Sequence, residues 1–335
     1  MNIAMITPWG VKCGIFTYSR DLIWDLAKQD QEIYVVRFPR FGMKNEAIME
    51  NLANRVPVDK IDLIHVQHEY GLTQTFDEAL YRGLMQLDKP IVTTSHSIGD
   101  FKRDSRIYNS SDRVIVHNKF CKRLFGYDPV IIPHGCKSIE PMPRDEAKEK
   151  LGIDPRVSVV GYCGFISEAK GLETLISAMV GVKNAGIMLG GGWFSGPDTT
   201  YIATLKQKSR EALGDRCKWV GFVEDHELNR FYSAMDVFVY PSRYATESGA
   251  LLMGMGHHKA TIASNIKPFK EKRVEGALTT FTSVNNLRNK IRRLFKNDEE
   301  RELLEAGAKS YVEKYSWENV AKMHVKVYEE ALNSE

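Results

Sequence analysis

Histidine and carboxylate side chains follow several apolar runs of this sequence. His68 and Glu69 follow the run DLIHVQ, His96 follows PIVTTS, and Glu247 comes shortly after VFVYPS. Ligands of open parallel sheets bind outside the carboxyl ends of the strands. If these runs are parallel strands, the four side chains lie where a ligand would bind.

Two glycine-containing turns indicate a different chemistry, the binding of phosphate. The segment GFISEAKGLETL begins at Gly164 and places Lys170 beside Gly171, where we expect a helix to begin. A lysine there adds charge to the oriented N–H groups of a helix N-terminus, which suits a diphosphate. Lys170 could equally be a surface lysine near a helix cap. In the turn PWGVKCGIF, Gly14 could let N–H groups approach an anion. The spacing is not GxGxxG, however, and predicts no dinucleotide site.

Metal binding is not expected. His257 and His258 are neighbours on an expected helix, with side chains about 100° apart, and they lack the i,i+4 spacing of two metal ligands. Carboxylates do not cluster as a magnesium site requires. The five cysteines are scattered and form no CxxC motif. This pattern predicts reduced thiols in a cytoplasmic protein, with no zinc site.

Short apolar runs alternate with amphipathic helical segments along the whole chain. Nearly continuous runs rich in Val and Ile are typical of parallel strands buried on both faces. Six runs in each half predict an α/β protein with two doubly wound, Rossmann-like sheets facing across a cleft. The runs are NIAMITP, EIYVVRF, DLIHVQH, PIVTTSH, RVIVHN and VIIPHG, then VSVVGYCG, GIMLGGG, CKWVGFV, VFVYPS, ATIAS and LTTFTS.

The length of 335 residues suits two domains of roughly 150 residues each. We expect the first domain over residues 1–138 and the second over 147–315. The stretch KSIEPMPRDEA (137–147) holds two prolines and no periodicity, and it predicts the linker. The chain ends in a helical stretch, 316–335, that follows no further strand.

Charge and hydropathy exclude some partners. The net charge of +3 is too small to indicate a nucleic-acid-binding protein, and no apolar run approaches the ~18 residues of a membrane span. The start MNIAMITPWG is typical of a first strand rather than a signal peptide. Between Gly99 and Leu124, however, seven Lys and Arg oppose three Asp. This basic stretch, residues 102–123, is either a solvated helix face or a contact for an anionic acceptor or a membrane surface.

In their order and spacing, these segments resemble the GT-B fold retaining glycosyltransferases of family 4 (glycosyl transferases group 1). The resemblance spans nearly the whole chain. It implies a hexosyltransferase that moves a sugar from a UDP- or GDP-sugar to an acceptor hydroxyl with retention at the anomeric carbon. It also implies that no cofactor or metal is required. The segments that carry it are PWGVKCGIF, DLIHVQHEYGL, KPIVTTSH, VIIPHG, GFISEAKGLETLISAM, WVGFVEDHELNRFYSAMDVFVYPS, ATESGALLMGMGHHKATIAS and YSWENVAKMHVKVYEEAL.

The resemblance also implies roles for single residues. The amide of Gly14 would approach the donor phosphate, and His96 would contact the transferred sugar near its reacting carbon. Lys170 would neutralise the diphosphate leaving group. The loop that ends at Val223 would hold the nucleotide base. The terminal helix, 316–335, would cross back and brace the first domain.

The segment around Glu247 departs from the family pattern. Related enzymes carry two glutamates here, and those positions hold Ala245 and Met253. The usual Gly-x-Pro is replaced by His258-Lys259-Ala260, and an arginine by Phe165. These changes weaken the case for ordinary ribose binding and leave the case for a transferase.

Some branches of the family carry Ser-Gly-Ala/Thr-Leu in this segment, and SGALLMG resembles them. We therefore expect the N–H groups of Ser248, Gly249 and Ala250 to bind the phosphate and the sugar hydroxyls. Glu247 either grips a sugar or ribose hydroxyl or only stabilises the helix N-terminus.

The acceptor is the part of the site that the sequence defines least. The candidates to contact an acceptor glycan, lipid or other hydroxyl compound are His68, Glu69, Lys102, Arg103 and Arg106. Two other functions stay open. One is a nucleotide-sugar epimerase or a phosphorylase of the same fold, and the other is a catalytically silent sugar-nucleotide-binding protein.

Overall fold

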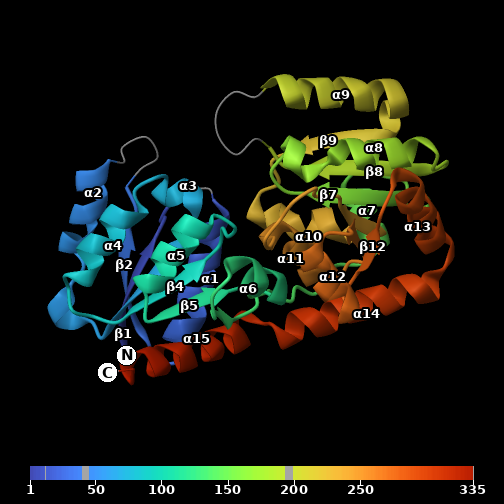
Figure 1. Cartoon of the computed structure of the whole chain (residues 1–335). Helices are drawn as coiled ribbons and strands as arrows, with labels where there is room; N and C mark the ends of the chain where they lie inside the picture. Colours follow the sequence, from blue (N-terminus) through green and yellow to red (C-terminus); the bar gives the residue numbers. More distant parts are fainter. Residues whose placement is uncertain (12, 40–44, 193–198, 335) are drawn as a thin grey trace. The chain divides into compact units, whose positions relative to one another are not determined.

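A computed structural model of the chain describes residues 1–11, 13–39, 45–192 and 199–334. It divides into two compact units. Unit 1 consists of Met1–Gly135 with Tyr315–Glu335, and unit 2 consists of Cys136–Lys314. Each unit holds a six-stranded parallel sheet with flanking helices, which confirms the predicted α/β class with two doubly wound sheets (Figure 1). The stretch expected to be the linker, 137–147, lies in unit 2, and its last residues are already helical.

The strands of unit 1 are β1 (Asn2–Thr7), β2 (Glu32–Arg37), β3 (Leu63–His68), β4 (Ile91–Ser95), β5 (Arg113–Val116) and β6 (Val130–Ile131). Its helices are α1 (Gly14–Ala27), α2 (Glu46–Glu50), α3 (Tyr70–Thr73), α4 (Asp77–Met85), α5 (Phe101–Asn109), α6 (Lys119–Phe125) and α15 (Trp317–Leu332). Two 3-10 helices, η1 (Asn51–Arg55) and η2 (Val58–Lys60), precede β3.

The sheet of unit 1 has the strand order β2-β1-β3-β4-β5-β6. Successive side chains of a strand point to opposite faces, and each face has its own core. Ile3 and Met5 of β1 pack with Tyr18 and other residues of α1 and α15. Ala4 and Ile6 pack on the opposite side, in a core shared with α2, α4, α5 and α6. The helix α15, which follows no strand, thus completes the layer that α1 begins.

The strands of unit 2 are β7 (Ser158–Cys163), β8 (Ala185–Gly190), β9 (Cys217–Gly221), β10 (Val237–Tyr240), β11 (Thr261–Ser264) and β12 (Thr279–Phe281). Its helices are α7 (Arg144–Lys150), α8 (Leu172–Val180), α9 (Thr199–Leu213), α10 (Asp225–Ser233), α11 (Gly249–Gly256), α12 (Lys267–Val274), α13 (Val284–Lys296) and α14 (Asp298–Lys314). Two 3-10 helices, η3 (Glu168–Lys170) and η4 (Gly214–Arg216), complete the unit.

The sheet of unit 2 has the order β12-β11-β10-β7-β8-β9. The order reverses between β7 and β10, and doubly wound sheets bind ligands in the crevice outside the strand ends at such a point. In unit 1 the order reverses between β1 and β3. The loops after these four strands carry most of the residues that the sequence singles out, so the topology gathers them at two such reversal points, one in each unit.

The small residues of the stretch 245–264 serve the packing of α11 on the sheet. A Cβ at Gly254 would overlap the ring of Phe238 in β10, so only glycine allows this close approach. The expectation that His257 and His258 lie on a helix is wrong, because α11 ends at Gly256. His257 caps the helix, and His258 turns the chain with a φ of +51°.

Unit 1 buries two histidines between its sheet and α15. The Nδ1 of His65 lies 2.8 Å from the Tyr328 hydroxyl, and its Nε2 lies 2.8 Å from the Thr94 hydroxyl. The Nδ1 of His324 donates a hydrogen bond to the Val320 carbonyl at 2.8 Å. Burial lowers the pKa of both imidazoles, to about 4 for His324. Both rings are therefore neutral at pH 7.

We predict that acid destabilises the fold through His324. Its pKa is about 4 when folded, against 6.5 for an exposed histidine, so the unfolded chain binds more protons below pH 6.5. Lowering the pH from 7 to 5 should remove about 2 kcal/mol of unfolding free energy through this residue. Urea unfolding at both pH values measures the loss. His324→Gln should lose less, and an equal loss in both proteins would contradict the prediction.

Candidate functional site

The loop after β7 and the end of β10 approach each other closely in unit 2. A Cβ at Gly171 would lie 2.5 Å from the carbonyl oxygen of Pro241, and the φ of Gly171 is +61°. The carbonyl of Ala169 accepts a hydrogen bond of 2.8 Å from the Arg243 N–H. Because only glycine fits such a contact, this packing holds the backbone on both sides of Lys170.

Lys170 is held over an aromatic ring. Its Nζ lies 5.6 Å from the ring centre of Tyr240, and Tyr240 is stacked on Tyr162 with ring centres 5.7 Å apart. Lys170 forms no ion pair with any residue that the structure describes. A half-buried ammonium group that no carboxylate neutralises is suited to an anionic ligand.

The N-terminus of α11 lies beside this lysine. Ser248 caps the helix, and its hydroxyl donates a hydrogen bond of 2.8 Å to the Tyr240 hydroxyl. The N–H groups of Gly249 and Ala250 are in the first turn and have no partner within the described ranges. Such N–H groups bind anions, with help from the helix dipole. Tyr240 thus brings together Lys170 and the predicted donor loop.

Gly164, like Gly171, allows two segments of the candidate site to pack closely. A Cβ at Gly164, whose φ is +151°, would lie 3.2 Å from the Cβ of Ala250. A Cβ at Gly191 would overlap the carbonyl of Gly164. Gly191 was not among the site residues predicted from the sequence, although the glycine run 190–192 at the end of β8 was a signal for it.

Val223 and its neighbour Phe222 face different ways. The Val223 side chain is buried, and a Cβ at Gly190 would lie 2.9 Å from it. Phe222 is 49% exposed. In the loop expected to hold the nucleotide base, Phe222 therefore has its side chain on the surface, whereas that of Val223 is buried.

Glu247 forms a buried ion pair. Its Oε2 lies 2.7 Å from the Nζ of Lys272, and the two side chains are 6% and 3% exposed. Its Oε1 accepts a hydrogen bond of 2.9 Å from the N–H of Ser248. Burial by itself would lower the pKa of Lys272, but the Glu247 carboxylate and the neighbouring Tyr311 raise it above the ordinary value. These contacts join the start of α11 to α12, and no local pattern in the sequence pointed to Lys272.

In unit 1, the start of α1 is open. Cys13 caps the helix by accepting the Phe16 N–H at 3.4 Å, and no described atom lies within 4 Å of a Cβ at Gly14. Tyr18, one turn later, packs edge-on against His96 with ring centres 4.8 Å apart. The helix α1 thus connects the two residues of unit 1 that the sequence assigns to the donor.

His96 is held by a chain of polar groups. Its Nε2 lies 2.9 Å from Gln67 Oε1, and its Nδ1 lies 3.2 Å from the Nε2 of His117. The Nδ1 of His117 donates to the Ile132 carbonyl at 3.1 Å. Burial, with the nearby imidazoles of His117 and His134, keeps the pKa of His96 well below its usual value. The network therefore presents a neutral imidazole in a fixed orientation. Gln67, a polar residue within a buried strand, was the feature of the sequence that could have indicated this network.

Three acceptor candidates are engaged in the fold of unit 1. The Nε2 of buried His68 lies 2.7 Å from Asp77, and Arg103 donates to both carboxylate oxygens of Asp77 at 2.6 and 3.0 Å. Burial opposes the ionisation of Asp77, but these two partners lower its pKa overall. Arg103 also lies over the ring of Tyr70, and Glu69 caps α3. All three side chains hold α3, α4 and α5 in place.

The two other acceptor candidates differ from each other. Arg106 forms an ion pair of 2.9 Å with Glu78. Lys102 is exposed and has no ion pair among the residues that are described. Its neighbour Phe101 is 73% exposed and is stacked on Tyr127. Within the basic stretch, a cation thus stands next to an exposed aromatic ring.

In the part of the chain that the structure describes, no group of three or more His, Cys, Asp or Glu could hold a metal ion. No described helix is both long and apolar enough to cross a bilayer.

Comparison with known proteins places residues 157–297 in the family model described as Glycosyl transferases group 1. The chain is 26% identical over 251 residues to the lipopolysaccharide core biosynthesis mannosyltransferase LpsB of Rhizobium meliloti, with 69% of this chain and 71% of that protein covered. It is 24% identical over 261 residues to the lipopolysaccharide 1,2-N-acetylglucosaminetransferase of Salmonella typhimurium, with 72% and 68% covered.

Solved structures share the fold. Sucrose-phosphate synthase from Thermosynechococcus elongatus matches with a TM-score of 0.80 and 20% identity, over the full length of both chains. HepE of Anabaena in complex with UDP-glucose matches with a TM-score of 0.78 and 17% identity, over 98% of this chain and all of that one. The predicted GT-B fold is confirmed. The resemblance to the glycosyl transferases of group 1 is confirmed for residues 157–297, and the relatives that the chain matches are named glycosyltransferases.

The Glu247–Lys272 pair predicts a specific pattern of stability. Lys272→Met leaves a buried carboxylate without its cation and should lower the unfolding free energy by about 3–5 kcal/mol. The double variant with Glu247→Gln removes both charges and should recover part of that loss. Urea unfolding of the wild type, both single variants and the double variant measures the coupling. Purely additive losses would show that the pair does not stabilise this region.

Proposed function

We propose that this glycosyltransferase moves a sugar from a UDP- or GDP-sugar to an acceptor hydroxyl, as family 4 enzymes do. The reaction retains the anomeric configuration and needs no metal ion. The main support is the juxtaposition in unit 2 of Lys170 with the N–H groups of Gly249 and Ala250, around Tyr240. The UDP-glucose complex of HepE also supports a nucleotide-sugar donor.

The chemistry requires charge stabilisation on the leaving group. The bond from the anomeric carbon to the diphosphate oxygen breaks, and a bond to the acceptor oxygen forms on the same face. The acceptor proton passes to the departing phosphate oxygen. Lys170 and the N–H groups of α11 are suited to stabilise the negative charge that develops on the diphosphate. A cation and fixed dipoles supply what a metal ion would otherwise supply.

Other site residues take supporting parts in this proposal. Gly14 leaves room for the donor phosphate at the start of α1, and the neutral imidazole of His96 orients the transferred sugar. The carboxylate of Glu247, paired with Lys272, holds the donor loop rather than moving a proton. Ribose and sugar hydroxyls then depend on backbone groups of residues 248–250.

Calorimetric titration with UDP and with GDP tests the donor site. We expect one of them to bind, and Lys170→Ala to weaken that binding by about 1.5–3 kcal/mol through loss of a charge-assisted contact. Lys206→Ala is a matched control, because its ammonium also lies over an aromatic ring, that of Trp219 at 5.7 Å. The control should bind like the wild type. If neither nucleotide binds, the proposal fails.

Product analysis separates the alternatives. Release of UDP with an altered free sugar and no acceptor product would favour an epimerase. Nucleotide binding without turnover over a broad acceptor panel would favour a silent binding protein. Transfer to an acceptor, with the anomeric configuration of the donor kept, supports the proposal.

For the acceptor side, we propose contact with an anionic membrane surface through α5 and α6. Exposed Phe101 and Leu124 stand among the exposed cations Lys102, Lys119 and Arg123. Aromatic rings beside basic residues are typical of surfaces that bind anionic lipid. Both curated relatives described above are named for lipopolysaccharide, a lipid-linked glycan.

Sedimentation with lipid vesicles tests this surface. The protein should bind vesicles of phosphatidylglycerol and phosphatidylcholine, and Lys102→Gln should weaken binding roughly fivefold, as for about 1 kcal/mol per cation. Phe101→Ser should weaken it further. Trp24→Ser is the control, because Trp24 is 68% exposed on α1 of the same unit. Equal binding by all variants, or equal binding to pure phosphatidylcholine, would contradict the proposal.

A further inference from the structure

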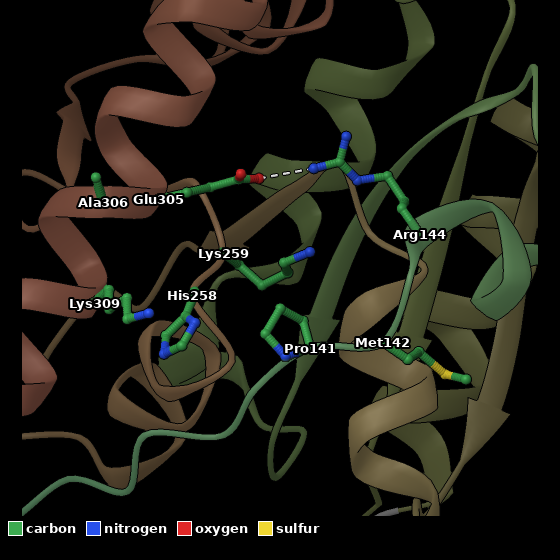
Figure 2. Close-up of a pocket in the computed structure, with 8 residues that line it drawn as sticks. All are labelled: Pro141, Met142, Arg144, His258, Lys259, Glu305, Ala306 and Lys309. Carbon is green, nitrogen blue, oxygen red and sulfur yellow. Dashed lines mark hydrogen bonds and ion pairs between the residues drawn. The ribbon is translucent and has the colours of Figure 1, made fainter.

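Unit 2 contains a pocket of about 290 Å³ at the other end of its sheet from the candidate donor site (Figure 2). Lys259 of the pocket precedes β11, and Met235 beside it precedes β10, whereas Ser248 and Glu247 follow β10. The pocket is therefore separate from the donor loop. It is lined by Pro141, Met142, Arg144, His258, Lys259, Glu305, Ala306 and Lys309.

The backbone of this pocket is strained at His258. Its φ of +51° is in the left-handed region, which costs a non-glycine residue roughly 1–2 kcal/mol. A glycine would adopt this turn without strain. The histidine instead places its ring on the pocket wall, where Nε2 lies 2.8 Å from the Ser138 hydroxyl. Strained backbone is often found at functional sites.

The next residue, Lys259, has unused hydrogen-bonding capacity. Its side chain is buried, and its Nζ donates to the Met235 carbonyl at 3.1 Å. An ammonium group has three N–H donors, and that of Lys259 makes no other hydrogen bond or ion pair within the described ranges. Burial, with the positive charge of Arg144, lowers its pKa to about 8. A negatively charged ligand that accepts a hydrogen bond from Lys259 would offset both the cost of burying its ammonium group and the repulsion by Arg144.

The lining as a whole carries more positive than negative charge. Arg144 lies 2.8 Å from Glu305 and 3.5 Å from Asp236, and Asp236 is also 2.9 Å from Lys148. The Nε of Arg144 is buried and has no partner among the described atoms.

On the far wall, Lys309 is exposed and makes no ion pair with the described residues. The charge of Lys309 lowers the pKa of His258, and the carboxylates of Glu140 and Glu313 act on that pKa in the opposite direction. The side chains that line the pocket itself supply three cations and a single carboxylate. In Figure 2, Lys259 lies between Arg144 on one side and the side chains of His258 and Lys309 on the other.

We propose that this pocket binds a small phosphate-bearing anion, either inorganic phosphate or the phosphate group of a small metabolite. Lys259 and Lys309 contact the phosphate oxygens, and Arg144 supplies its free Nε–H. Pro141 and Met142 form an apolar wall for the rest of a larger ligand. The volume is at the small end for ligand pockets, which suits a compact molecule.

Inorganic phosphate is the probe, and the readout is the midpoint of thermal unfolding. A ligand of the folded state raises this midpoint with concentration. Titration of the full chain with phosphate, against sodium chloride at equal ionic strength, should raise the midpoint with phosphate alone. Lys309→Gln, an exposed substitution that leaves the core intact, should raise the apparent Kd roughly fivefold. Lys259→Gln should remove the effect.

Lys170→Ala distinguishes this pocket from the candidate donor site, which could also take phosphate. It should keep the phosphate effect in full. The proposal is overturned if phosphate and chloride act alike, or if Lys170→Ala loses the effect while Lys309→Gln keeps it. Because UDP binding is measured separately, the donor site can fail without affecting this result.

Discussion

The close approach of two backbone segments in unit 2 is the constraint on which the candidate site depends. The loop that carries Lys170 can hydrogen-bond to the end of β10 because Gly171 has no side chain to meet the Pro241 carbonyl. This contact sets Lys170 over Tyr240, and the Tyr240 hydroxyl in turn accepts from the cap of α11. A side chain at position 171 would therefore move a cation, a ring and a helix start together.

Two groups of buried charges fix elements beside the candidate site residues, the start of α11 in unit 2 and α3, α4 and α5 in unit 1. Glu247 is satisfied by Lys272, and Asp77 is satisfied by His68 and Arg103. A buried charge that loses its partner is costly, so these groups are poorly placed to exchange partners during a reaction. At the candidate donor site of unit 2, the described groups that remain to meet a phosphate are Lys170 and the N–H groups at the start of α11.

In addition to the buried ion pair of Asp77, unit 1 contains neutral imidazoles that share hydrogen bonds. His65, His96 and His324 lie in a buried polar region between the sheet and the layer of α1 and α15. Burial keeps the pKa of each below the physiological range. Neutral rings can share hydrogen bonds without the desolvation cost of a charge, which gives His96 a fixed orientation but no strong acidity.

The sequence by itself determined the architecture. Strands of a parallel sheet that are buried on both faces are nearly continuously apolar, and runs of this kind predicted the strands of both sheets. The same pattern put His96, Lys170 and Glu247 after strands, because residues at strand ends are neighbours in the chain and need no long-range information.

Only the tertiary structure decided what each of those residues contacts. The partner of Glu247 is 25 residues away on α12, and that of Arg103 is 26 residues away on α4. No spacing rule links such positions, because the sheet and helix packing bring them together. The same is true of the pocket at Lys259, whose walls come from the segment before α7 and its first residue, the turn after α11 and the middle of α14. The residue types at the strand ends can be identified from the sequence alone. The partner of each buried charge, in contrast, depends on which elements the fold places side by side.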